Sequence, residues 1–101
     1  MKGSGCIAIT LLTLVTGAAP AEDNVKGRSW AATCTGCHGT NGYSEGGMPT
    51  LAGLDKLAII NAMNEFKAGT KPATLMHQLA KGYSDVQIER IAAYFAAQAP
   101  K

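Results

Sequence analysis

The sequence predicts an all-α fold of four or five short helices and one long glycine-rich loop. Nowhere do β-branched and aromatic residues alternate with polar ones over several positions, as they would in strands. Apolar residues instead recur at helical spacing. Residues that begin and end helices stand at the edges of these segments, and 101 residues leave room for one domain.

The first expected helix runs from about Val25 into Cys34, with Trp30 on its inner face. Residues 39–53 hold five glycines and one proline, so we expect an irregular loop there. A second helix is expected over 56–68, and its apolar side consists of Leu57, Ile59, Ile60, Met63 and Phe66.

Signals at helix ends support the remaining assignments. Asp55 suits the N-cap of the second helix. A short helix over 72–80 opens with Pro72, whose missing N–H costs nothing in a first turn. The last helix has the clearest start, because Ser84 and Gln87 are spaced as a capping box. The apolar residues that follow at helical spacing are Ile88, Ile91, Ala92 and Phe95.

The N-terminal residues are expected to form a cleaved signal peptide that directs the chain to the periplasm. Lys2 supplies a positive start, residues 6–19 form an apolar run, and Ala19-Pro20-Ala21 fits a signal-peptidase site. We therefore assign 1–21 to the signal peptide and 22–101 to the mature domain. An uncleaved membrane anchor is the alternative. The run is shorter than the ~20 apolar residues of a spanning helix, so we expect no membrane span in the mature chain.

A mature chain of about 80 residues buries only ~60% of its unfolded surface and needs a stabilising element beyond its own core. Its two cysteines, Cys34 and Cys37, would close only a tiny loop as a disulfide, which favours a bound cofactor instead. The formal net charge of the whole chain is +2, and no basic run or basic–aromatic stretch occurs. We therefore expect no nucleic-acid partner.

The motif Cys34-Thr35-Gly36-Cys37-His38 is compatible with three kinds of site. A zinc site needs four ligands, and His77 would have to join the two cysteines and His38. The adjacent Cys37 and His38 fit one tetrahedron poorly. A dithiol redox site normally opens a helix after a strand. This motif follows an expected helix, and no strand is expected.

Covalent haem explains more of the sequence. In a CxxCH motif each cysteine sulfur bonds one vinyl group of the porphyrin, and the histidine that follows ligates the iron. In an exported chain this pattern is a strong signal for haem c, held here by Cys34 and Cys37 with His38 on the iron. One motif predicts one haem. This large apolar group supplies the core that the chain lacks.

The chain resembles the class I c-type cytochromes. The residues that carry the resemblance are the motif itself, the glycine-rich loop, Pro49-Thr50-Leu51-Ala52-Gly53, a methionine at position 76, and Ser84-Asp85 with Ile88. The resemblance implies a small helical fold wrapped around one haem, with the first and last helices crossing near Trp30 and Tyr94. It also implies that the carbonyl of Pro49 accepts a hydrogen bond from the second ring nitrogen of His38, which fixes the ring.

The methionines and one histidine compete for the sixth iron position. Met48 lies ten residues after His38 in a loop expected on the histidine side, and Met63 lies on an apolar helix face. Met76 stands where the class resembled places its ligand, before the approach to the last helix. His77 is its rival, because adjacent helical residues point ~100° apart and cannot both face the iron. An open iron is the third alternative. We expect Met76, which favours electron transfer over catalysis at the iron.

Further stretches resemble the haem subunit of flavocytochrome c sulfide dehydrogenase. They are Phe66-Lys67-Ala68-Gly69, residues 75–84 with Ala80-Lys81-Gly82-Tyr83-Ser84, and residues 91–95. In that family an FAD-containing flavoprotein subunit oxidises sulfide, and the cytochrome subunit passes single electrons on. The resemblance implies an electron carrier rather than an enzyme, with a flavoprotein partner and a downstream cytochrome or oxidase. Many members have two haem domains, so one motif implies a monohaem version.

Two other functions remain open. A free periplasmic carrier, similar to cytochromes c4, c5 or c-553, would use the same residues with a transient partner. A peroxidase-like or gas-binding haem protein would need an open sixth position, against which Met76 argues. Free carriers often steer encounters with a ring of one charge sign. This sequence has no such ring, which favours a stable, apolar partner interface.

Overall fold

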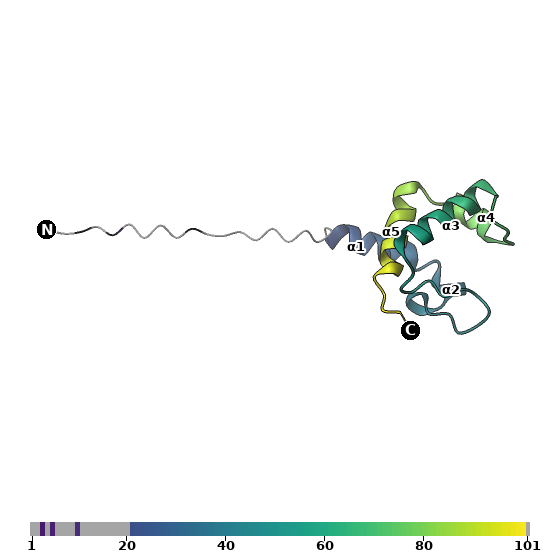
Figure 1. Ribbon diagram of the computed structural model, residues 1–101, viewed down its shortest axis with the longest axis horizontal. Coiled ribbons are helices and arrows are strands. Elements are labelled where there is room, and N and C mark those ends of the chain that lie inside the picture. The colour runs from purple at the N-terminus through teal and green to yellow at the C-terminus, as the bar shows by residue number, and fades with distance from the viewer. Residues whose placement is uncertain (1–2, 4, 6–9, 11–20, 101) are drawn as a thin grey trace.

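The computed structural model describes residues 3, 5, 10 and 21–100 (Figure 1). The predicted all-α class is confirmed, since five α-helices and one short 3₁₀ helix occur there and no strand does. The elements are α1 (Ala21–Ala31), α2 (Thr35–His38), η1 (Thr40–Gly42), α3 (Lys56–Ala68), α4 (Met76–Lys81) and α5 (Asp85–Ala96). Apart from a few single residues, the expected signal peptide lies outside the described residues, and its cleavage site stays a prediction. No helix in the described ranges combines the length and apolar character needed to cross a membrane.

The first helix lies closer to the N-terminus than the sequence predicts, because it begins at Ala21 rather than near Val25. It ends at Ala31 rather than running into Cys34. The hydroxyls of Thr33 and Thr35 each donate to the backbone carbonyl three residues earlier, at 2.9 and 2.7 Å. Such side-chain bonds compete with the helical backbone pattern, so the chain turns here and starts the separate helix α2.

The next two helices differ in how well local signals define them. α3 has the predicted bounds, and the carboxylate of Asp55 accepts from the backbone N–H three residues on, at 3.2 Å. α4 begins at Met76 rather than at 72, so that prediction was wrong. A local side-chain contact accompanies this difference, because His77 Nε2 donates to the carbonyl of Lys71, six residues earlier and outside the helix.

The last helix begins as predicted, because both capping-box hydrogen bonds are present. Ser84 Oγ accepts from the Gln87 N–H at 3.2 Å, and Gln87 Oε1 accepts from the Ser84 N–H at 2.9 Å. The carbonyl of Phe95, near the other end of α5, accepts from the Gly53 N–H at 2.9 Å. This bond ties the end of the glycine-rich loop to α5.

α5 is the centre of the fold (Figure 1). α1 and α3 both pack against it, α4 packs against α3, and α2 packs against η1. The expected crossing of the first and last helices is therefore present. The buried residues of the core come from α1, α3, α4 and α5, and they are Ala31, Ile59, Met63, Ala80, Ile88, Ile91, Ala92 and Phe95.

The crossing of α1 and α5 depends on Gly27. This glycine is buried, and a Cβ built on it would lie 2.8 Å from the carbonyl oxygen of Arg90. Real Cβ atoms do not come this close to backbone, so a side chain here would force the helices apart. Trp30 packs against the core, and Tyr94 lines the same surface hollow as Gly27 and Arg90. Both aromatic residues thus lie where the resemblance implies.

The first prediction concerns this contact. Gly27→Ala should lower the free energy of unfolding by about 1 kcal/mol or more, because the clash with Arg90 forces the backbone to shift. At an exposed helix position the same change would raise stability by ~1 kcal/mol. Chemical denaturation measures the difference. Ser29→Ala, at an exposed position of the same helix, is the control and should not destabilise. A Gly27→Ala protein more stable than its parent would contradict the close crossing.

Candidate functional site

His38 is the best-defined side chain of the site. It is the last residue of α2 and is buried, with 8% of its surface exposed. Its Nδ1 lies 2.7 Å from the carbonyl oxygen of Pro49. A carbonyl can only accept, so the Nδ1–H of His38 donates. The ring therefore has a fixed tautomer in which Nε2 carries the lone pair, the form that binds a metal.

The other nitrogen of this ring is available. Among the described residues, His38 Nε2 has no hydrogen-bond partner, and no fully buried side-chain nitrogen or oxygen lacks one. Nε2 must therefore face open space. A buried imidazole with one nitrogen held by the backbone and the other facing a gap is arranged to bind a ligand on that side.

The two cysteines lie on one turn directly before His38. Cys34 is the half-buried N-cap of α2, and Cys37 is exposed. The N–H of Cys37 and the N–H of His38 both donate to the carbonyl of Cys34, at 3.3 and 2.9 Å. This single turn places both thiols and the imidazole on one short, hydrogen-bonded segment.

The environment of Cys34 differs from that of a redox-active thiol. Burial raises the pKa of the Cys34 thiol, and a hydrogen bond with Thr33 offsets this only in part. A dithiol oxidoreductase requires the opposite shift, toward the thiolate. The motif also follows the helix α1 rather than a strand. In the part of the chain that the structure describes, no three His, Cys, Asp or Glu side chains gather as they would around a metal ion.

The chain reverses directly after His38, and only glycine permits this turn. Gly39 has φ 89° and ψ 162°, a region that residues with a side chain essentially do not occupy. A Cβ on Gly39 would lie 1.9 Å from the carbonyl oxygen of Tyr43. Helix and loop patterns in the sequence do not reveal this requirement. The only signal is the position of Gly39, directly after the motif.

The glycine-rich loop holds the Pro49 carbonyl in place through its own hydrogen bonds. The carbonyl of Gly42 accepts from the Leu51 N–H at 2.8 Å, which closes the loop at its base. Tyr94 of α5 donates its hydroxyl to Asn41 Oδ1 at 2.7 Å. The loop is thus fastened to itself and to α5 on either side of Pro49.

The three described methionines lie in different environments. Met63 is buried in the core, and Met48 is 45% exposed in the loop. Met76 is half-buried at the start of α4 and packs against the core with part of its surface. Among the described elements, η1 is the main packing partner of α2, whereas α4, which begins at Met76, packs mainly against α3.

His77 is engaged elsewhere. Its Nε2 donates to the carbonyl of Lys71, and its ring lies 6.3 Å from the ring of Phe66 at an angle of 55°. The sequence makes His77 a rival of Met76 for the iron. The structure instead has a half-buried ring that fixes the segment before α4.

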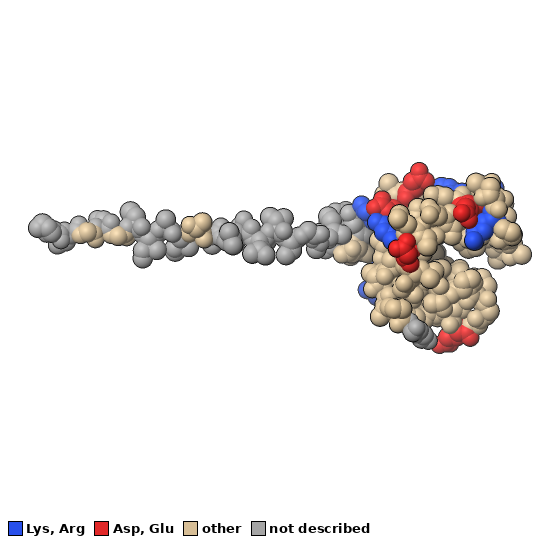
Figure 2. All heavy atoms as spheres, viewed as in Figure 1, with Lys and Arg blue, Asp and Glu red and all other residues tan. Residues whose placement is uncertain are grey.

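A notch separates the two halves of the molecule. α3 and α4 form one lobe, and α2 with the glycine-rich loop forms the other (Figure 1). Figure 2 shows the surface hollowed between these lobes, with mostly uncharged residues on the lower lobe and both blue and red atoms on the upper lobe near the hollow. Large apolar side chains from both lobes are exposed, namely Met48, Leu54, Leu57, Leu75 and Leu79. Exposed apolar surface on two facing lobes indicates that an apolar group covers it.

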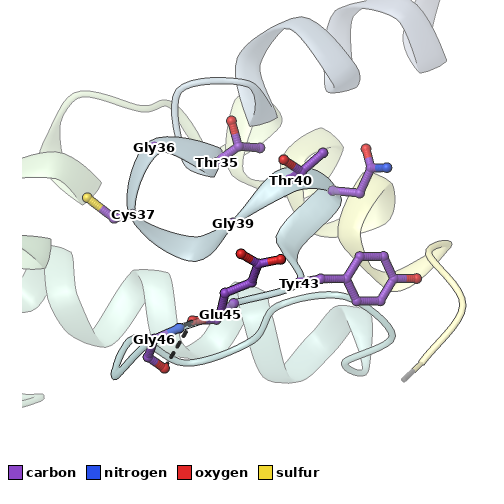
Figure 3. A pocket seen from close by; sticks show the side chains of 10 residues that line it. Thr35, Gly36, Cys37, Gly39, Thr40, Tyr43, Glu45 and Gly46 are labelled. Atoms are coloured by element: carbon purple, nitrogen blue, oxygen red, sulfur yellow. Dashed lines mark hydrogen bonds between the residues drawn. The ribbon is translucent and has the colours of Figure 1, made fainter.

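Another hollow lies beside residues 34–38, which we call the attachment turn, and it is a different site. It measures about 520 Å³ and is lined by residues of 35–46, with neither His38 nor Met76 among them. Hydroxyls, backbone and the carboxylate of Glu45 surround it, while the sulfur of Cys37 points away (Figure 3). This polar hollow does not suit a large apolar cofactor.

Known proteins similar to this chain are c-type cytochromes. The family model for cytochrome c matches residues 25–98. The cytochrome subunit of sulfide dehydrogenase from Chlorobaculum tepidum is 39% identical over 70 residues, covering 69% of this chain and 64% of that protein. Cytochrome c4 from Azotobacter vinelandii is 37% identical over 102 residues, covering 89% of this chain and 49% of that protein.

A solved structure supports the same fold. Cytochrome c4 from Acidithiobacillus ferrooxidans superposes with a TM-score of 0.68 at 30% identity, covering 81% of this chain and 52% of that one. The chain thus spans about half the length of these cytochromes c4 and 64% of the sulfide dehydrogenase subunit.

The second prediction tests the turn after the motif. Gly39→Ala should reduce both the folded yield and the amount of protein with covalently added haem, because its Cβ would overlap the Tyr43 carbonyl and displace the loop that holds Pro49. Holding a residue with a Cβ in this sparsely populated backbone region alone costs ~1–3 kcal/mol. Intact-mass spectrometry of the exported protein measures the haem content. Gly47→Ala, where no atom lies within 4 Å of the added Cβ, is the control. Equal haem content in both variants would contradict this role.

Proposed function

The chain belongs to the cytochrome c family of electron carriers with covalently bound haem c, and on this basis we propose which residues hold the haem. Cys34 and Cys37 form the two thioether bonds, His38 is one iron ligand, and Met76 is the other. The carbonyl of Pro49 orients the His38 ring.

One observation carries this proposal. His38 follows Cys37 directly, its Nδ1 is held by Pro49 at 2.7 Å, and its Nε2 faces open space. A backbone acceptor on the remote nitrogen is the arrangement that makes an imidazole a well-oriented and more basic metal ligand. The two thiols on the same turn supply the covalent attachment, so all three groups serve one cofactor.

The surroundings fit a haem in the notch. Haem is a large apolar plate, and exposed apolar side chains belong to the lobes on both sides of the notch. When bound, it supplies a one-electron Fe(III)/Fe(II) couple. The thioether of Met76 is a soft donor that favours the reduced state and raises the potential. Met76 also leaves no open coordination position, which suits electron transfer rather than catalysis.

The third prediction separates Met76 from His77. Met76→Ala should abolish the methionine–iron charge-transfer band of the oxidised protein, lower its potential, and raise the affinity for added imidazole ~10-fold or more, which is ~1.4 kcal/mol. His77→Ala is the matched neighbour and should keep the band, because His77 bonds to Lys71 instead. Absorption spectra and imidazole titrations measure both effects. Persistence of the band in Met76→Ala would rule out this ligand.

We further propose a periplasmic location and a flavoprotein partner, as in sulfide dehydrogenase. The relative from Chlorobaculum tepidum is by name a cytochrome subunit of that enzyme. Gly36 and Cys37 are exposed, so the group bound to Cys37 reaches the surface where a partner can approach. The exposed apolar side chains of Met48 and Leu79 support an apolar contact rather than a charge-steered one.

The contact surface proposed for this partner consists of the attachment turn, the loop over 43–48 and the segment over 76–83. Exposed Met48 and Leu79 supply apolar side chains to it. An interface with an apolar centre depends little on ionic strength, whereas an encounter steered by charge weakens as salt screens it.

The fourth prediction tests this partner. Sulfide added to the haem-loaded cytochrome with the candidate flavoprotein should reduce the haem rapidly, and the rate should change little at high salt. Without flavoprotein the reduction should be slow. Met48→Lys should slow the reaction, because it places a charge in the apolar contact. Val86→Lys is the control, since Val86 is 58% exposed at the start of α5 and outside the proposed surface.

The competing function is that of a free carrier. Cytochrome c4 relatives cover 89% of this chain in sequence and 81% in structure, which favours this alternative. It predicts a monomer in solution that exchanges electrons with oxidases or other cytochromes and gains no rate from the flavoprotein. That result would replace the flavoprotein proposal and leave the haem ligands unaffected.

A further inference from the structure

A pair of hydroxyls joins two segments that are distant in the sequence. Tyr83 lies in the turn between α4 and α5 and is half-buried. Its hydroxyl forms a hydrogen bond with the hydroxyl of Thr33, which lies in the turn directly before Cys34. The bond therefore connects the segment after Met76 to the segment that carries the cysteines.

The direction of this bond follows from the partners of each group. Thr33 donates its hydroxyl proton to the carbonyl of Trp30 at 2.9 Å. A threonine hydroxyl has one proton, so Tyr83 is the donor and Thr33 the acceptor between the two hydroxyls. Tyr83 is also held at its backbone, because Lys67 Nζ donates to the Tyr83 carbonyl at 2.7 Å. Both ends of the tyrosine are anchored.

This contact has no substitute in the described part of the chain. Among the hydrogen bonds of the described residues, no other joins residues 76–83 to residues 33–38. The glycine-rich loop is tied to α5 instead, through Tyr94 and Phe95. Among the described residues, the hydroxyl pair is therefore the one hydrogen bond between these two segments, in addition to the packing of α4 against α3.

α4 is too short to be a stable helix by itself, so it needs contacts with the rest of the fold. It has six residues, and no side chain caps its first turn. Helices of this length are not stable alone in water. The packing of α4 against α3 and the Tyr83–Thr33 bond together hold it, so loss of the bond lowers the free energy needed to open the segment.

We propose that Tyr83 is a positioning residue: its hydroxyl, bonded to Thr33, holds the Met76 segment closed against the attachment turn and so limits release of Met76. The inference rests on the proposed role of Met76 as an iron ligand. An added ligand such as imidazole binds only when Met76 has left. Its apparent affinity is therefore proportional to the fraction of molecules in the open state.

The fifth prediction follows from that relation. Tyr83→Phe removes only the hydroxyl and should raise the apparent affinity of the oxidised, haem-loaded protein for imidazole by about 2- to 10-fold, the range of one net hydrogen bond. Thr33→Val should raise the affinity at least as much, because it removes this bond and also the bond to the Trp30 carbonyl. The double variant should show no increase beyond that of Thr33→Val, since the Tyr83–Thr33 bond is already absent there. Thr33→Ser, which keeps the hydroxyl, should behave like the parent.

Tyr94→Phe is the matched control. It also removes a tyrosine hydroxyl bond, to Asn41 at 2.7 Å, but on the histidine side of the notch. It should lower the free energy of unfolding as much as Tyr83→Phe does, and leave imidazole affinity unchanged. Equal imidazole affinity in Tyr83→Phe and the parent, with the methionine–iron band present in both, would overturn the role of Tyr83 alone. Absence of that band from the parent would overturn the ligation by Met76 and this inference with it.

Discussion

The hydrogen bond from His38 Nδ1–H to the Pro49 carbonyl, 2.7 Å long, is the contact on which the rest of the site depends. It fixes the tautomer and the orientation of the ring and leaves Nε2, which is not fully buried, without a hydrogen-bond partner among the described residues. The bond can form only because Gly39 reverses the chain and because the Gly42 carbonyl closes the loop. An otherwise irregular loop is thus held in one conformation by a few backbone contacts whose common result is the position of one acceptor.

The fold divides into a part that packs with its own side chains and a part that does not. α1, α3, α4 and α5 share the apolar core, and the attachment turn with the loop lies beside it. A chain this small buries only a modest fraction of its surface on folding. Apolar side chains left exposed on both lobes would cost stability in water, and a covalently held apolar plate removes that cost. The cofactor thus supplies apolar contacts that the small core of the chain does not supply by itself.

How far the sequence predicts the structure depends on whether a feature leaves a recognisable pattern of residue types. The bounds of α3 and the capping box of α5 follow from neighbouring residues, and both were predicted. The end of α1 and the start of α4 were predicted wrongly. Threonine hydroxyls and the His77–Lys71 bond accompany these boundaries, and helical spacing does not register them. The pairing of Thr33 with Tyr83 joins residues 50 positions apart and has no signal in the sequence pattern.

The chemistry of the site was more accessible from the sequence than its geometry, because the two-residue spacing of the cysteines and the adjacent histidine specify a cofactor directly. The central claim is that the turn over residues 34–38 carries a covalent haem. Peptide mapping by mass spectrometry of the exported protein tests it most directly. We expect one haem on the peptide that contains Cys34 and Cys37. A folded, exported protein with both thiols unmodified would contradict it.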